Sequence, residues 1–376
     1  VAASKALKVS RSKVTQATAR ADESEAARLP AIRFQGTYTR LNDVGPVQFD
    51  NPIIPGAKIV LSEPILNNTQ LSVTASQVLF AGFRLDAAKD IANLAVQAAQ
   101  LDERNDEMSV RYAVSTAYWS LYKLKEFRRA LEQTGTQLNA RVRDAEVLFK
   151  AGTLTSNDVM KLKVQAANVK AQELDVVQQS GSVMIALNNL MGEPLTTVLE
   201  LVTTPMWTET DAAAVQEAVS KAREERPDVR ATRLRLQAAL RGIDAANAGW
   251  WPQIGVNATY LYANPNQRIF PNRPQFDGTW AVGVSASWDV WNWMLPAHQA
   301  TQARAQAVQL QESLAMMQDG VTVEAMQNYM ALAPARERIA VADQAESQAK
   351  ENAANVSGRF TVGAATGTDV LEAEAM

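Results

Sequence analysis

The residue types that carry out most enzyme chemistry are scarce in this chain. His298 is its single histidine and cysteine is absent, so there is no thiol chemistry, no disulfide and no histidine-based metal site. The sequence also lacks a glycine-rich phosphate loop, a metal-ligand cluster and a nucleophile arrangement. The most regular pattern that involves acidic residues is a Thr followed three positions later by an Asp. It occurs at Thr155 and Asp158 and again at Thr366 and Asp369, and it is typical of helix starts. We therefore expect no catalytic residue, metal or cofactor, and predict that the chain is not an enzyme.

The two Thr-x-x-Asp segments belong to a longer motif that occurs twice. FKAGTLTSNDV at 149–159 returns as FTVGAATGTDV at 360–370, 211 positions later. Two shorter matches accompany it: VTAS at 73–76 with VSAS at 284–287, also 211 apart, and LPAI at 29–32 with WPQI at 251–254, 222 apart. A repeat of this length indicates a duplicated structural unit. The first repeat is longer than the second between Pro30 and Val73.

The composition favours long helices and excludes some partners. Ala, Gln, Val and Leu dominate long stretches that contain few Gly or Pro. The formal net charge of −3 argues against a nucleic-acid surface. No apolar run of 18 residues is present, so no transmembrane helix is expected. Val1 falls within a predicted helix, and we expect the chain to be trimmed there and its last helix to continue beyond Met376.

Each repeat contains a predicted β-hairpin, at 31–80 and at 253–290. Apolar and polar residues alternate in both, as in Trp280, Val282 and Val284, and period two is typical of a strand with two different faces. Residues 43–67, between the two long strands of the first hairpin, are rich in Pro, Asn and Gly, and we expect a loop there. Strands of about 10 residues span a bilayer when tilted by about 45°. A soluble sheet with one buried face is the alternative interpretation.

Six of the eight tryptophans fall between positions 250 and 293. Aromatic residues near strand ends are typical of the two interfaces of a membrane barrel. The tryptophans that we assign to such a belt are Trp250, Trp251, Trp280, Trp288 and Trp291.

Helices of unusual length follow both hairpins. The first is predicted at 84–149 and would be roughly 95 Å long at 1.5 Å per residue; the second is predicted at 297–358 with a kink at Pro334. A returning helix is expected at 157–190. We expect three parts: a first repeat (1–191), a mixed α/β region (192–226) with a short strand at 198–202, and a second repeat (227–376).

Two hairpins supply four strands, which cannot close into a barrel, and open strand edges are not tolerated in lipid. The chain must therefore borrow strands from copies of itself. Three chains would give twelve strands, enough for an open lumen. The predicted fold is mainly α with membrane β: a duplicated helix–hairpin–long helix–helix unit forming a homotrimeric 12-stranded β-barrel continued by a long α-helical barrel.

The order helix–Pro–hairpin–long helix–FxxGxxTxxDV–helix, given twice, resembles that of the TolC-like outer-membrane efflux proteins. The resemblance covers essentially the whole chain and is most specific in the two motifs at 149–159 and 360–370. It implies a homotrimer in the outer membrane that extends into the periplasm. It also implies a periplasmic adaptor protein as partner, and through it an inner-membrane pump or exporter.

The resemblance further implies a periplasmic aperture lined by acidic residues of the second motif, which match Asp369 and Glu372. These residues lie three positions apart and can share a helix face, so a trimer would gather them into rings that raise pKa values and attract cations. The alternative is that Asp369 only stabilises a helix N-terminus. Phe360 occupies a position where some relatives carry a tyrosine, and it lacks the hydroxyl for that hydrogen bond.

The resemblance also implies that the adaptor docks at the two helix-to-helix turns formed by the repeated motifs at 149–159 and 360–370, which we call the two tips. The matching residues are Gly152, Thr155, Asp158, Gly363 and Thr366. Turn and capping chemistry alone also accounts for them, and for Asp158 we favour capping. The predicted function is a passive exit duct of a tripartite efflux pump or type I secretion system, gated at its periplasmic tip. The alternative is a periplasmic coiled-coil adaptor or spacer without a pore, which would lack the paired amphipathic hairpins.

Overall fold

The computed structural model describes residues 3–50, 52–56, 58–62, 64–205, 213–362 and 364–376. The helices are α1 (Lys5–Ala26), α2 (Arg84–Lys150), α3 (Ser156–Met191), α4 (Ala213–Glu225), α5 (Pro227–Asn247), α6 (Leu295–Thr361) and α7 (Gly367–Ala375), with a 3-10 turn at Ala248–Trp250. The strands are β1 (Ala31–Arg40), β2 (Val47–Asp50), β3 (Lys58–Ser62), β4 (Asn67–Ala81), β5 (Gln253–Asn264) and β6 (Asp277–Ser287).

The chain divides into two units that share its long helices. Unit 1 comprises Val1–Lys13, Gln100–Arg230 and Ala315–Met376, and unit 2 comprises Val14–Ala99 and Ala231–Leu314. All four strands of the larger sheet lie in unit 2, and both repeated motifs lie in unit 1. None of the described helices combines the length and the apolar character needed to cross a membrane.

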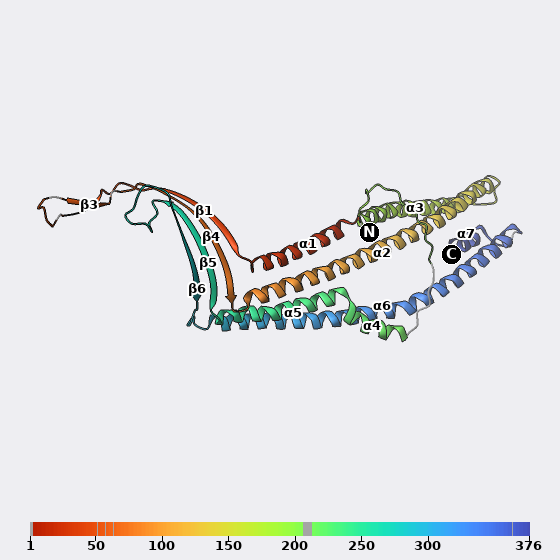
Figure 1. The fold of residues 1–376 in the computed structure, drawn as a ribbon. Helices are drawn as coiled ribbons and strands as arrows, with labels where there is room; N and C mark the ends of the chain where they lie inside the picture. The colour runs from red at the N-terminus through yellow and green to blue at the C-terminus, as the bar shows by residue number, and fades with distance from the viewer. Residues whose placement is uncertain (1–2, 51, 57, 63, 206–212, 363) are drawn as a thin grey trace. The chain divides into compact units, whose positions relative to one another are not determined.

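The sheet of unit 2 is antiparallel with the order β1-β4-β5-β6 (Figure 1). The two hairpins have the same register: Phe34 faces Val73 in the first, and the equivalent residues Val256 and Val284 face each other in the second. The predicted duplication is therefore present in the strand pairing itself. The pairing of β4 with β5 joins the two repeats into one sheet.

The register sorts side chains onto an apolar face and a polar face. Val73 of β4 lies opposite Tyr260 of β5, which in turn lies opposite Trp280 of β6. On the other face Thr74 lies opposite Thr259, with their hydroxyl oxygens 3.2 Å apart. The apolar face is open to solvent in the single chain, since the exposed fractions of Trp280, Val282 and Val284 are 74%, 64% and 73%. The described part of the chain therefore forms no core over these residues.

In unit 1, α2 and α3 form an antiparallel pair with a narrow apolar seam. Leu131, Leu138 and Ala145 recur every seven residues on α2 and are buried. They pack on Val159, Leu162, Val169 and Val176 of α3. A seven-residue repeat is the pattern of coiled-coil packing, which explains how the two helices pair along one narrow apolar stripe. The ion pair of Lys163 with Glu146, at 2.6 Å, lies beside this seam.

Several sequence expectations need correction. The segment at 43–67, for which we expect a loop, contains a small two-stranded sheet of β2 and β3. The strand predicted at 198–202 does not form, and those described residues have no regular structure. Pro334 lies within α6, which is one continuous helix, and the predicted kink at this residue stays a prediction.

Side chains, rather than a sheet, hold the segment that follows α3. The fully buried Asn188 donates from Nδ2 to the carbonyl oxygens of Leu195 and Thr197. The Tyr118 hydroxyl donates to the carbonyl of Thr203 and accepts from its N–H. Backbone groups that a strand neighbour would have satisfied are thus bonded to side chains.

Candidate functional site

The first tip, where α2 turns into α3, is a Schellman turn followed by a capping box. Gly152 has a φ of +78°, the N–H of Gly152 donates to the carbonyl of Phe149, and the N–H of Thr153 donates to the carbonyl of Leu148. Thr155 then starts α3: its side chain accepts from the N–H of Asp158, and the Asp158 carboxylate accepts from the N–H of Thr155. The predicted capping role of Asp158 is confirmed.

The second tip repeats this geometry at the end of α6. The N–H of Ala364 donates to the carbonyl of Arg359 at 2.8 Å, the counterpart of the Thr153–Leu148 bond. Thr366 caps α7, and the Asp369 carboxylate accepts from the N–H of Thr366 at 2.7 Å. Gly363 lies outside the described residues, so its predicted turn role stays a prediction.

The caps lower the pKa of both aspartates. Hydrogen bonds from the side chain and the backbone of Thr155 lower the pKa of Asp158 below its ordinary value. Hydrogen bonds from the backbone and then the side chain of Thr366 lower the pKa of Asp369. The donors favour the charged carboxylate in each case, so both residues carry a negative charge near neutral pH.

We expect the first tip to lose stability in acid. Because the folded pKa of Asp158 is below the unfolded value of about 3.9, its contribution is present above that value and is lost as pH falls through the folded pKa. Amide hydrogen exchange in the first turn of α3 should speed up over this acidic range beyond the intrinsic pH effect. Asp158→Asn should remove that extra dependence, whereas Asp175→Asn, on an exposed residue of the same helix, should leave it. Equal profiles for all three proteins would contradict the assignment.

The two acidic residues that we predict to line the aperture both face solvent. Asp369 and Glu372 are exposed, whereas Val370 and Ala373 are 6% and 5% exposed. The helix α7 contacts α3, and a methyl group placed on Gly367 would lie 4.0 Å from Leu154. The structure therefore brings the start of α7 against the start of α3 and turns the carboxylates away from that contact. Phe360, near the end of α6, is half-buried.

The tryptophans assigned to the belt are exposed and lie at two levels of the sheet. Trp250, Trp251, Trp288 and Trp291 lie where strands meet helices, with Trp288 Nε1 donating to the carbonyl of Trp250 at 3.2 Å. Trp280 lies within β6, opposite Tyr260 and toward the far end of the sheet. Their exposed fractions range from 43% to 74%.

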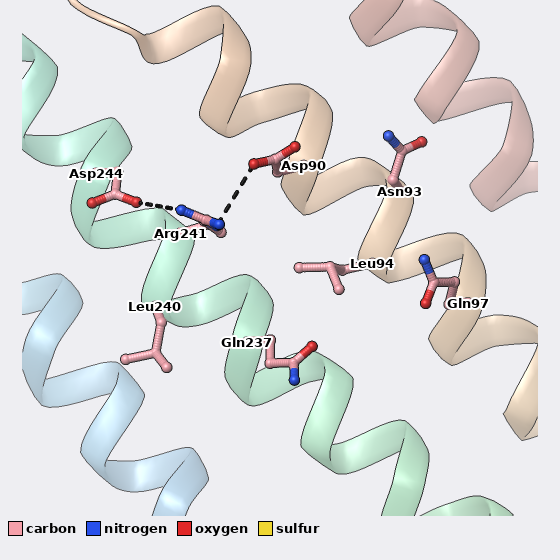
Figure 2. A pocket seen from close by; sticks show the side chains of 8 residues that line it. All are labelled: Asp90, Asn93, Leu94, Gln97, Gln237, Leu240, Arg241 and Asp244. Carbon is pink, nitrogen blue, oxygen red and sulfur yellow. Dashed lines mark hydrogen bonds and ion pairs between the residues drawn. The ribbon is translucent and has the colours of Figure 1, made fainter.

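The sequence did not indicate a groove in unit 2 that polar, charged and leucine side chains line together. This groove of about 620 Å³ lies between α2 and α5 (Figure 2). At one end Arg241 forms ion pairs with Asp90 at 3.6 Å and with Asp244 at 3.3 Å. Asn93, Leu94 and Gln97 of α2 and Gln237 and Leu240 of α5 line the remainder. Asp90 and Arg241 are far apart in sequence, so no local pattern could have paired them.

The same arrangement of elements occurs in known proteins. A family model described as outer membrane efflux protein matches residues 1–193 and 218–376. The chain belongs to the outer membrane efflux protein family. The predicted TolC-like fold is thereby confirmed, and this family consists of transport channels rather than enzymes.

Individual members of the outer membrane efflux protein family are distant in sequence. The outer membrane efflux protein BepC of Brucella suis biovar 1 is 24% identical over 315 residues, which is 81% of this chain and 65% of BepC. The pyoverdine export outer membrane protein OpmQ of Pseudomonas aeruginosa is 25% identical over 168 residues, 44% of this chain and 34% of OpmQ. The match therefore spans less than two thirds of either relative.

A solved structure of an outer membrane protein shares the fold over nearly the whole chain. VceC of Vibrio cholerae superposes with a TM-score of 0.75 at 20% identity, covering 99% of this chain and 86% of VceC. Agreement over this length at such low identity indicates that the pattern of strands and helices is retained while individual side chains differ.

Proposed function

We propose that this chain is a subunit of a passive exit duct in the outer membrane that extends into the periplasm. The observation that carries the proposal is the sheet of unit 2, whose apolar face is exposed and whose outer strands, β1 and β6, have no further strand neighbour among the described residues. A bilayer solvates an apolar face, and it excludes open edges. The sheet is therefore suited to a closed barrel made from several copies.

Three copies would supply twelve strands, with the polar face lining the lumen. Two copies would supply eight strands, whose interior is filled by side chains. The polar row that includes Thr74 and Thr259 suits a water-filled lumen, and the row that includes Val282 and Val284 suits lipid. This strand count and membership of the family both support a homotrimer.

At the periplasmic tip, we assign the gate to Asp369 and Glu372 of α7, together with Phe360 near the end of α6. The two carboxylates are exposed on one face of α7, so three copies arranged about an axis would form adjacent acidic rings. Such rings concentrate cations at a constriction. The pore would then prefer cations in its resting state.

The tip turns are the proposed docking surface for a periplasmic adaptor, which would link the duct to an inner-membrane pump or exporter that supplies the energy. The residues are Gly152, Thr155 and Asp158 of the first tip and Gly363 and Thr366 of the second. Among the described residues, nothing lies within 4 Å of a methyl group placed on Gly152, so an adaptor could approach its backbone closely.

The five belt tryptophans would contact lipid at the two interfaces of the membrane. Four of them lie at the helix side of the sheet and Trp280 lies toward its other end, so tryptophans occur at both levels where a membrane barrel carries aromatic residues. Their exposure in the single chain leaves the rings free for this contact.

Ion conductance distinguishes the duct from a poreless adaptor or spacer. The purified protein should produce discrete conductance steps in a planar lipid bilayer. A protein that inserts but never conducts, or that stays in solution without detergent, would contradict the duct and favour the spacer.

A further inference from the structure

The two repeats have the same strand-to-helix junction, but only one of them is packed within the chain. Where β4 leads into α2, the rings of Phe80, Phe83 and Trp251 form an edge-to-face cluster. The ring centres of Phe80 and Phe83 lie 6.4 and 6.3 Å from that of Trp251. Trp251 lies two residues before β5, which pairs with β4, so strand pairing brings the three rings together.

The equivalent residues of the other junction are exposed. Trp291 and Met294 lie 211 positions after Phe80 and Phe83, and Leu29 lies 222 positions before Trp251. Their exposed fractions are 71%, 49% and 63%. Leu29 precedes β1 and the other two follow β6, and β1 and β6 are opposite edges of the sheet.

The backbone of both junctions has the same unusual conformation. Gly82 and Phe83 have φ values of +63° and +67°, and the equivalent residues Trp293 and Met294 have +56° and +61°. The left-handed region is unfavourable for residues other than glycine, so its occurrence at both junctions indicates a common turn. The second turn therefore presents Met294 in the way that the first presents Phe83. Trp291, unlike Phe80, lies beyond the end of its strand, where it packs edge-to-face on Trp293 with ring centres 5.9 Å apart.

We propose that a second copy of this chain completes the exposed junction. Trp291 and Met294 of one copy pack on Leu29 of the neighbouring copy, as Phe80 and Phe83 pack on Trp251 within the chain. The inference rests on the proposed barrel and assigns its subunit seam residue by residue. Phe83 and Trp251 keep exposed fractions of 59% and 53% in the packed cluster, so a seam contact leaves Trp291 a face for lipid.

The same equivalence gives the strand register of the seam. Val73 faces Tyr260 where β4 pairs with β5. The equivalent pair is Val284 of one copy and Tyr38 of the neighbouring copy, both of which are exposed in the single chain, at 73% and 66%. Both belong to the apolar face, so the barrel keeps one apolar surface across the seam.

The seam differs from the internal junction at one point. A methyl group on Gly82 would lie only 2.5 Å from the carbonyl oxygen of Ala248, so the internal junction has no room for a side chain there. The equivalent residue is Trp293, which is 81% exposed. The seam between copies is therefore wider at this level, and internal and subunit junctions alternate around a three-fold barrel.

Cysteine cross-linking tests the seam directly, because the chain contains no other thiol. In the double variant Leu29→Cys/Met294→Cys, assembled in detergent and oxidised, we expect covalent dimers and trimers on a denaturing gel. In the control Leu29→Cys/Val282→Cys the second thiol lies in the middle of β6, away from the junction that contains Met294. This variant should stay monomeric on the gel. Two results would contradict the proposed seam contacts: equal cross-linking in both variants, or no cross-linking in the first variant while light scattering shows a trimer. Neither result would contradict the trimer itself.

A second variant tests the contact without cross-linking. Leu29→Trp copies Trp251 into the first repeat and should raise the temperature at which the trimer dissociates by several degrees. An unchanged or lower dissociation temperature contradicts the packing. A wild-type protein that is monomeric in detergent would overturn the proposed function, and the seam with it.

Discussion

Arginine at position 282 should remove most of the folded trimer from the membrane, whereas arginine at position 281 should be tolerated. Val282 is the central residue of β6 and lies on the exposed apolar face with Trp280 and Val284. Its neighbour Ala281 points to the opposite face, where it lies opposite Thr259. Arginine on the lipid side of a barrel costs about 2–4 kcal/mol at the bilayer midplane, and each trimer would carry three such residues.

The two variants form a matched pair, since they introduce the same charge at adjacent positions of one strand. The amount of trimer in the membrane fraction and the denaturant midpoint of the purified protein should fall for Val282→Arg and change little for Ala281→Arg. The reverse ranking would place the apolar face inside the barrel. Equal loss for both variants would indicate that neither face of β6 meets lipid.

Neutralising the second tip should abolish the cation preference of the pore. Asp369→Asn/Glu372→Gln keeps the size of both side chains, and the amide oxygen introduced at position 369 would still accept a hydrogen bond from Thr366, so α7 keeps its cap. Fixed charges at a narrow site change the local ion concentration by about tenfold or more. We therefore expect the ratio of cation to anion permeability to fall by about tenfold in the double variant.

Alanine at the same two positions distinguishes the effect of the carboxylate charge from the effect of the width of the constriction. Asp369→Ala/Glu372→Ala shortens both side chains and should also raise the resting conductance, because the constriction widens. Asp158→Asn serves as the control, since Asp158 has the same capping geometry at the other tip and is not assigned to the aperture. Single-channel recordings with unchanged selectivity and conductance in both double variants would exclude the acidic rings as the gate.

The parts of the fold that depend on local sequence could be predicted. Both capping boxes follow from Thr and Asp three residues apart, and the structure contains each of them. The hairpins follow from alternation, and their matching registers follow from the duplication. The long helices begin and end within two or three residues of the predicted positions because turn and capping residues mark their ends, although Pro334 and several glycines lie within them.

The parts that depend on distant partners could not be predicted. The apolar run at 198–202 was expected to be a strand, but no described strand lies beside it, and Tyr118 and Asn188 bind the segment that contains it. The pairing of β2 with β3 was missed because turn-forming residues dominate 43–67. The ion pair of Asp90 with Arg241 joins two charged helix-surface residues that are far apart in sequence, so no local pattern predicts it.

The central claim is that copies of this chain close a membrane barrel around a pore, and single-particle imaging of the protein in detergent tests it most directly. We expect a hollow cylinder with three-fold symmetry and a detergent belt at one end. A solid rod without a belt would contradict the claim, because the apolar face of the sheet would then meet something other than lipid.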